Sequence, residues 1–188
     1  MALRVIAGSV GGRRLVAPQG DARPSTDRLK EALFASLGRH RTDDASVLDL
    51  YAGSGALAIE ALSRGAERAV LVDHDFAAQR AILANLGAVG FRDVARFQRI
   101  TVASFLVGEA AEAPFDVVFL DPPYDTGLVE TTLQVLGGGG LLLAEGLVIA
   151  QHFTKRAPAA TLGALATFRS RRFGETTLTF YRASGPGR

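Results

Sequence analysis

Four consecutive residues, Asp121-Pro122-Pro123-Tyr124, place a carboxylate, two rigid backbone units and an aromatic ring at the end of an apolar stretch. Because proline fixes the backbone and donates no N–H, the Asp121 carboxylate and the Pro122 carbonyl can be held as paired acceptors. The exocyclic amine of a nucleobase offers two matching donors, and Tyr124 can stack on a base that has left its helix or is single-stranded. The tetrapeptide predicts catalysis at an amine nitrogen. A rigid turn with a packed tyrosine is the alternative.

A glycine-rich turn, residues 49–55 (Asp-Leu-Tyr-Ala-Gly-Ser-Gly), precedes the tetrapeptide and lies between an apolar stretch and an Ala- and Leu-rich segment. Such turns let a ligand approach the backbone closely in dinucleotide-binding folds. Asp73 lies 20 residues after Gly53, where a carboxylate can accept hydrogen bonds from ribose hydroxyls. Asp49 favours the cationic methionyl group of S-adenosylmethionine over a pyrophosphate, although it can also cap the turn. We expect cofactor contacts from Asp49, Gly53, Ser54, Gly55 and Asp73.

Residues that other mechanisms need are absent or scattered. The chain has no cysteine, so it cannot form disulfides, thiolate metal sites or the covalent adduct used to methylate carbon. The three histidines are far apart and match no metal-ligand spacing, so we expect no metal. An amine nitrogen needs no covalent nucleophile, and the sequence therefore predicts direct, in-line methyl transfer that leaves S-adenosylhomocysteine.

Short apolar runs alternate with amphipathic segments from residue 46 onward, a pattern typical of a doubly wound, largely parallel α/β sheet. We predict seven strands, of which the last is antiparallel and forms a hairpin with the one before it. The predicted strands are 47–51, 69–72, 95–99, 115–120, 147–151, 166–171 and 176–182. The predicted helices are 56–64, 76–89, 102–109 and 128–136. This arrangement brings the turn and the tetrapeptide to the carboxyl edge of the sheet.

The segment before the sheet has the composition of a small hairpin, residues 4–17, followed by a helix that begins after Pro24-Ser25-Thr26 and ends at Gly38. Apolar residues fall on one face of that helix, and Arg28, Lys30 and Glu31 should lie away from it. We divide the chain into a basic extension (1–42), a catalytic domain (43–183) and a flexible tail (184–188). The four glycines at residues 137–140 predict a flexible loop.

Charge is distributed unevenly along the 188 residues. Residues 1–42 carry a net +5, residues 43–150 carry −9 and residues 151–188 carry +6. Basic ends around an acidic centre are compatible with solvated loops or with two flanks that bind a polyanion. Position favours RNA binding by the basic residues of the N-terminal segment: Arg4, Arg13, Arg14, Arg23, Arg28 and Lys30. Three arginines of the C-terminal region can extend this surface: Arg169, Arg171 and Arg172. No apolar segment suits a signal peptide or membrane helix, so we expect a cytoplasmic protein.

The whole chain resembles the RsmD family of bacterial 16S ribosomal RNA guanine-N2 methyltransferases, which have a Rossmann-like class I fold. The resemblance rests on the arginine- and glycine-rich start (4–15), the segment 23–34, the turn region 49–65 and the tetrapeptide 121–124. It implies cofactor contacts that include Tyr51, base handling by the tetrapeptide, and RNA contacts in the hairpin. It also implies 16S rRNA within a partly assembled small subunit as the substrate. We expect a monomer with no membrane partner.

Two positions depart from the family pattern. The family often has an acidic residue after the third strand, where this chain has Ser104 as a candidate, and a glutamate at the end of the fifth, where it has Gln151. Three alternatives stay open: an adenine-N6 methyltransferase acting on RNA or DNA, a catalytically inactive RNA-binding relative, and an NAD-dependent dehydrogenase.

Overall fold

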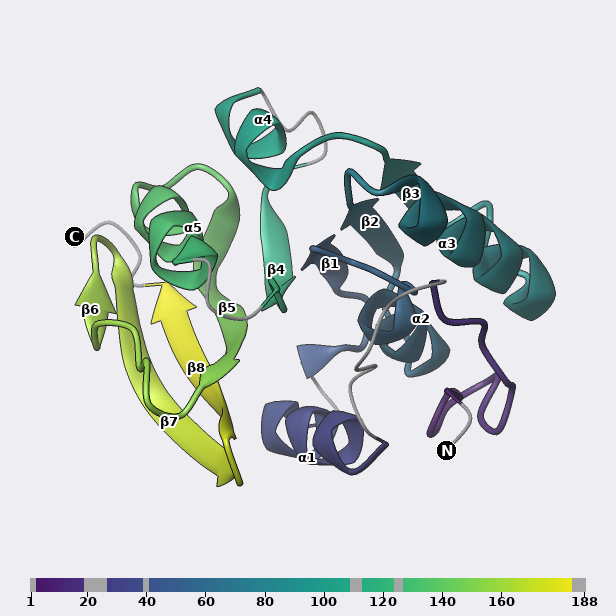
Figure 1. Cartoon of the computed structure of the whole chain (residues 1–188), viewed down its shortest axis with the longest axis horizontal. Helices are drawn as coiled ribbons and strands as arrows, with labels where there is room; N and C mark the ends of the chain where they lie inside the picture. The colour runs from purple at the N-terminus through teal and green to yellow at the C-terminus, as the bar shows by residue number, and fades with distance from the viewer. Residues whose placement is uncertain (1–2, 19–26, 39–40, 109–112, 124–126, 184–188) are drawn as a thin grey trace.

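A computed structural model describes residues 3–18, 27–38, 41–108, 113–123 and 127–183. Within them, one eight-stranded sheet has the order β3-β2-β1-β4-β5-β8-β7-β6 (Figure 1). Strands β1 to β5 are parallel, and β8 runs antiparallel between β5 and β7. The strands are β1 Ser46–Leu50, β2 Arg68–Val72, β3 Ala95–Gln98, β4 Phe115–Leu120, β5 Leu142–Phe153, β6 Thr161–Leu162, β7 Leu165–Phe173 and β8 Thr176–Ala183.

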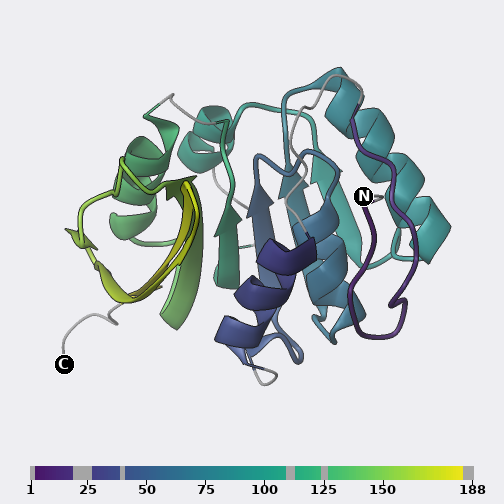
Figure 2. The same cartoon turned by 60° about the horizontal axis from the view of Figure 1, so that its bottom comes forward.

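Helices cover both faces of the sheet, which confirms the doubly wound architecture (Figures 1 and 2). Buried side chains of α1, α2 and α3 form one apolar cluster with one face of the central strands, and those of α4 and α5 form a second cluster with the other face. The helices are α1 Asp27–Leu37, α2 Ala56–Ser63, α3 Phe76–Val89, α4 Val102–Val107 and α5 Leu128–Gly137.

Local sequence explains where these elements begin and end. The central strands are buried on both faces, so they are nearly continuous runs of apolar residues rather than alternating ones. Asp75 caps α3 by accepting a hydrogen bond from the backbone N–H of Ala77, and Gly90 ends it in a left-handed conformation. The predicted bounds of the first four strands differ from the observed ones by at most one residue.

The prediction of seven strands was one strand short. The additional strand, β6, has two residues that pair with β7, and it packs against the end of α5. At Gly137 a side chain is excluded, because a Cβ there would lie 2.0 Å from the carbonyl oxygen of Leu162. The glycine tract therefore begins inside α5, where it permits this close approach, rather than as a loop.

Residues 3–18, here called the N-terminal strap, run along the outer side of α2 and α3 (Figure 2). Arg4 and Arg14 form an isolated antiparallel bridge, so the predicted hairpin is present with very short pairing. The predicted end of the following helix at Gly38 is confirmed, whereas its predicted start and the 184–188 tail lie outside the described residues. No helix in the described ranges is long and apolar enough to cross a membrane.

Candidate active site

The carboxyl ends of β1, β2 and β4 meet at one edge of the sheet. Leu50, the last residue of β1, is paired with Val72 of β2 on one side and with Leu120 of β4 on the other. Asp73 and Asp121 follow directly after those partners and therefore flank the glycine-rich turn. Open α/β sheets bind ligands at this edge, as predicted for the turn and the tetrapeptide.

Asp73 organises the turn that it flanks. Its Oδ2 accepts a hydrogen bond from the backbone N–H of Gly53 at 2.9 Å, and its Oδ1 accepts one from the N–H of Asp75, also at 2.9 Å. The side chain keeps 12% of its surface exposed. An ionised carboxylate has about four acceptor positions, so Asp73 retains capacity for the hydroxyl donors of a ribose.

The backbone of the turn adopts conformations that few side chains tolerate. Gly55 precedes α2 with a φ of 73°, and a Cβ there would lie 2.8 Å from Cδ2 of Leu71. Tyr51 has a φ of 62°, a left-handed conformation that is rare and strained in a bulky residue. Such strain is concentrated at functional sites, where the surrounding structure stabilises it. Gly55, at the N-cap of α2, has no side chain to cap the helix, and the N–H of Ala58 in the first turn is bound by Asp49 instead.

Asp49 is buried in β1 with 1% exposure, and it accepts a hydrogen bond from the backbone N–H of Ala58 in the first turn of α2 at 3.1 Å. Burial raises the pKa of Asp49 well above its ordinary value; this hydrogen bond lowers it, and the negative charges of Asp121 and Asp73 raise it further. Asp49 is thus close enough to Asp121 and Asp73 for the charge of each to act on it. These carboxylates fit a cationic ligand such as the methionyl portion of S-adenosylmethionine. Asp49 also caps α2 through its bond to Ala58.

Three other predicted cofactor residues lie at or near this edge. The hydroxyl of Tyr51 shares a hydrogen bond of 3.0 Å with Oγ1 of Thr132 on α5, and burial raises its pKa. Ser54 is half-buried within the turn. Ser104 is exposed in the first turn of α4, where its backbone N–H donates to Oγ1 of Thr101 at 3.1 Å. Direct contact of these side chains with a cofactor stays a prediction.

The described part of the tetrapeptide lies beside a cavity. Asp121 is half-buried, Pro122 is buried and Pro123 is exposed, whereas Tyr124 lies outside the described residues. The cavity has a volume of about 280 Å³ and lies between the ends of β4 and β5 and the start of α5. Its lining consists of Pro122, Pro123, Gly127, Val129, Glu130, Gln151, His152, Phe153, Arg156, Ala157 and Pro158.

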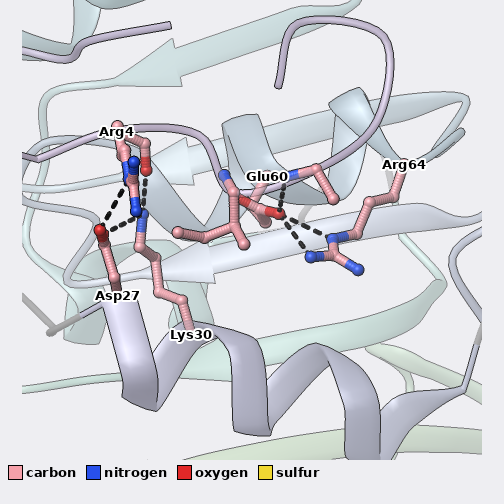
Figure 3. Close-up of polar contacts among 7 residues, drawn as sticks. Arg4, Asp27, Lys30, Glu60 and Arg64 are labelled. Carbon is pink, nitrogen blue, oxygen red and sulfur yellow. Dashed lines mark hydrogen bonds and ion pairs between the residues drawn. The ribbon is translucent and has the colours of Figure 1, made fainter. Parts of the chain in front are cut away.

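The predicted RNA-binding arginines that the structure describes are exposed on the strap and on α1. Arg4 also forms an ion pair with Asp27, at 2.9 Å between Nε and Oδ2 (Figure 3). Arg169 on β7 is exposed and donates a hydrogen bond to the carbonyl oxygen of Ser36, which brings that strand next to α1. Arg23 lies outside the described residues, and the exposed members of the N-terminal group are Arg4, Arg13, Arg14 and Arg28.

The prediction that Lys30 contacts RNA and lies away from the packed face of its helix was wrong. Lys30 is fully buried, and its ammonium group donates a hydrogen bond to the carbonyl oxygen of Arg4 and lies 3.9 Å from Asp27 (Figure 3). Burial lowers the pKa of Lys30, and the charges of Glu60 and Asp27 partly offset that effect. Lys30 therefore anchors the strap to α1.

Two buried polar residues were missed in the sequence. Both carboxylate oxygens of Glu60 on α2 accept backbone N–H groups of the strap, from Ile6 at 2.6 Å and from Ala7 at 3.1 Å, and Glu60 also pairs with Arg64 (Figure 3). Asn85 on α3 contacts both the strap and the cofactor turn. The only signal in the sequence was a polar side chain on the buried face of an otherwise apolar helix, which requires hydrogen-bonding partners.

The doubly wound sheet, the strained glycine-rich turn and the acidic residues at its carboxyl edge define a class I S-adenosylmethionine-dependent methyltransferase. Residues 3–182 match the family described as Conserved hypothetical protein 95. The chain belongs to this family, the RsmD family, and the resemblance stated from its sequence is confirmed.

A relative and one solved structure agree with this assignment, and a second structure shares the fold. The Escherichia coli (strain K12) protein named Ribosomal RNA small subunit methyltransferase D is 40% identical over 147 residues, which cover 78% of this chain and 72% of that protein. The structure of yhhF from Escherichia coli matches with a TM-score of 0.86 and 33% identity, over 98% of this chain and 99% of that one. An RNA methyltransferase from Salinibacter ruber, in complex with S-adenosyl-L-homocysteine, shares the fold at a TM-score of 0.66 and 17% identity, over 88% and 97% of the two chains.

Proposed function

We propose that this protein transfers a methyl group from S-adenosylmethionine to the exocyclic N2 amine of a guanine in 16S rRNA. The observation that carries the proposal is the meeting, at one sheet edge, of the cofactor turn, the Asp121 and Pro122 acceptors and a cavity. The name of the Escherichia coli relative supports ribosomal RNA as the substrate class. The proposed substrate is a partly assembled small subunit, and the proposed enzyme is a cytoplasmic monomer.

The residues around the turn suit the two ends of the cofactor. S-adenosylmethionine, when bound, supplies a methyl group carried by a positively charged sulfur. Asp73 is placed to accept the ribose hydroxyls while it holds Gly53, and Asp49 adds negative charge beside the first turn of α2 in its ionised form. The repulsion of Asp49 by Asp121 and by Asp73 would be relieved by a cation at this edge.

Asp121 and Pro122 provide the acceptors for the amine. The Asp121 carboxylate and the Pro122 carbonyl accept the two N–H groups, which directs the nitrogen lone pair toward the methyl carbon. Methyl transfer would form the N–C bond at the expense of the C–S bond, with the electron pair left on sulfur, and the Asp121 carboxylate would take up one nitrogen proton. Acceleration comes chiefly from holding the reacting atoms in line, because no covalent adduct with the protein is required.

Glu130 and Arg156, which line the cavity beside Pro122 and Pro123, favour guanine over adenine. Guanine offers O6 and N7 as paired acceptors, which an arginine can bind through two hydrogen bonds. Its N1–H donor suits the Glu130 carboxylate, since both N2–H groups are taken by Asp121 and Pro122. Adenine carries an amine donor in place of O6, so the same guanidinium would face a donor rather than an acceptor.

The test measures which nucleoside is methylated. Tritiated cofactor is incubated with naked 16S rRNA and with small subunits from a strain that lacks the enzyme, and the RNA is digested and its nucleosides identified. We expect N2-methylguanosine, with subunits the better substrate. N6-methyladenosine would overturn the guanine assignment, and cofactor binding without any methylation would indicate an inactive relative.

Specificity is tested with Glu130→Gln and Arg156→Gln. Each should lower kcat/KM for the subunit by about 10-fold, since a good base contact contributes roughly 1–3 kcal/mol. Affinity for the free cofactor should not change. Glu175→Gln, in the exposed turn between β7 and β8, is the matched control and should behave like the parent. Unchanged kcat/KM in both cavity variants would remove these residues from base recognition.

A further inference from the structure

The N-terminal strap is held by buried side chains on three successive helices of the fold. Lys30 on α1 binds the carbonyl of Arg4, and Glu60 on α2 accepts two strap N–H groups (Figure 3). Ser63 on α2 accepts from the N–H of Val10 at 3.1 Å. Asn85 on α3 binds the far end of the strap. A surface arm that only carried arginines would not need buried anchors along its length.

Asn85 is the anchor that also reaches the cofactor turn. It is 1% exposed, and its Oδ1 accepts a hydrogen bond from the N–H of Val16 at 2.7 Å. Its Nδ2 donates to two carbonyl oxygens, those of Val16 and Ser54, each at 2.9 Å. Both amide donors and the amide oxygen are thus occupied, and one side chain joins strap and turn.

The position of Ser54 makes this bond relevant to the cofactor. Ser54 lies between Gly53, which Asp73 binds, and Gly55, which precedes α2 with a left-handed φ. Its carbonyl orientation depends on the same peptide units that shape the turn. Asn85 therefore holds the turn at the carbonyl of Ser54, and Asp73 holds it at the N–H of Gly53.

The other end of the Asn85 contact lies next to the cationic part of the strap. Val16 follows Arg13 and Arg14 within three residues, and both arginines are exposed. Phosphates bound there would restrain the strap close to Val16. That restraint can reach Ser54 through one buried side chain, because the amide of Asn85 is bonded to both Val16 and Ser54.

We propose that Asn85 is a positioning residue that couples the RNA-binding strap to the cofactor turn, so that RNA and cofactor each raise the affinity for the other. This inference rests on the proposed function, because it takes the strap arginines as an RNA surface. The coupling is reciprocal by thermodynamic necessity, and coupling factors of roughly 5–150 are typical.

The experiment measures cofactor affinity with and without RNA. Calorimetry with S-adenosylhomocysteine is performed on the full-length parent, on Asn85→Ala and on Asn85→Asp, in the absence and presence of a 16S rRNA transcript. In the parent we expect RNA to tighten binding by about 10-fold. In both variants the ratio should fall to about 1, and affinity without RNA should also fall. Melting temperatures identify any variant that has not folded, and Asn85→Asp keeps the side-chain shape while it removes both amide donors.

Ser63→Ala is the matched control, because it removes the hydroxyl bonds from α2 to Ala7 and Val10 of the strap and leaves the contact of Asn85 with Ser54 untouched. It should retain the coupling ratio of the parent. If Asn85 were only one of several anchors of the strap, Ser63→Ala would lower the ratio as the Asn85 variants do. The inference is overturned if RNA leaves cofactor affinity of the parent unchanged, if an Asn85 variant keeps the ratio, or if Ser63→Ala abolishes it. A parent that binds no cofactor at all would instead overturn the proposed function.

Discussion

Asp73 accepts a hydrogen bond from the backbone N–H of Gly53, 2.9 Å from that nitrogen to Oδ2, and so joins the end of β2 to the glycine-rich turn after β1. The same carboxylate that is predicted to bind the cofactor ribose therefore also shapes the turn that receives the rest of the cofactor. Loss of its charge should affect both roles together.

Substitution of Asp73 by alanine should weaken cofactor binding by roughly 1.5–3 kcal/mol, the value of hydrogen bonds to a charged group. Asp73→Asn keeps one acceptor for Gly53 and should lose less. Calorimetry with S-adenosylhomocysteine measures both changes. Asp93→Ala, at an exposed position after α3, serves as the control. An unchanged affinity in Asp73→Ala would exclude Asp73 from the site.

Asp121→Ala should leave the fold and cofactor affinity nearly intact and lower turnover by roughly 100-fold or more, because the lost acceptor acts when nitrogen approaches the methyl carbon. The relevant quantity is kcat at saturating cofactor and subunit, accompanied by the melting temperature. Near-normal turnover in a folded Asp121→Ala variant would contradict the assignment of this residue to catalysis.

The regular parts of the sheet were predictable because each central strand is an apolar run followed by a turn residue, and each helix has a cap or a glycine at its end. Strand β6 was not, since a two-residue strand carries no period of its own and exists through tertiary contact with β7 and Gly137. Strand β5 begins at Leu142, earlier than predicted, because Glu145 adopts a φ of 65° and the pairing with β4 shifts its register there.

The residues of the candidate site were identifiable because their spacing places them after neighbouring parallel strands. Lys30 was misassigned because helical periodicity ignores the strap, which covers that side of α1 and supplies a carbonyl partner for the ammonium group. Asn85 and Glu60 escaped notice for the same reason. Their partners in the strap are backbone groups more than fifty residues away along the chain, which no local pattern encodes.

The pKa of Asp49 gives the site a pH dependence. Its folded-state pKa is raised, so the stability contributed by the protonated carboxyl is present below its ordinary value of 3.8 and is lost as pH rises through the raised value. A cationic ligand prefers the ionised carboxylate, so affinity for S-adenosylmethionine should increase over the same interval.

Asp49→Asn should remove both pH trends and stabilise the free protein above that interval. It should also reduce the preference for S-adenosylmethionine over S-adenosylhomocysteine, whose sulfur is uncharged. Melting temperature and calorimetry against pH provide the check, and an unaltered pH profile in the variant would assign the dependence to other groups.

Neutralising Arg13 and Arg14 together, as Arg13→Gln with Arg14→Gln, should weaken RNA binding and lower its salt slope by roughly 1–2 units, since both guanidinium groups are exposed on the strap. Affinity for S-adenosylhomocysteine without RNA should stay close to that of the parent, because neither side chain is bonded to the turn.

Lys30→Met separates charge on the surface from charge in the interior. It removes one positive charge but leaves the carbonyl of Arg4 without its buried donor, so it should lower the melting temperature while the salt slope of the folded variant stays unchanged. Filter binding at several salt concentrations measures the slopes. A double variant with the affinity and slope of the parent would show that RNA docks elsewhere, with the β7 arginines, Arg169, Arg171 and Arg172, as the next positions to neutralise.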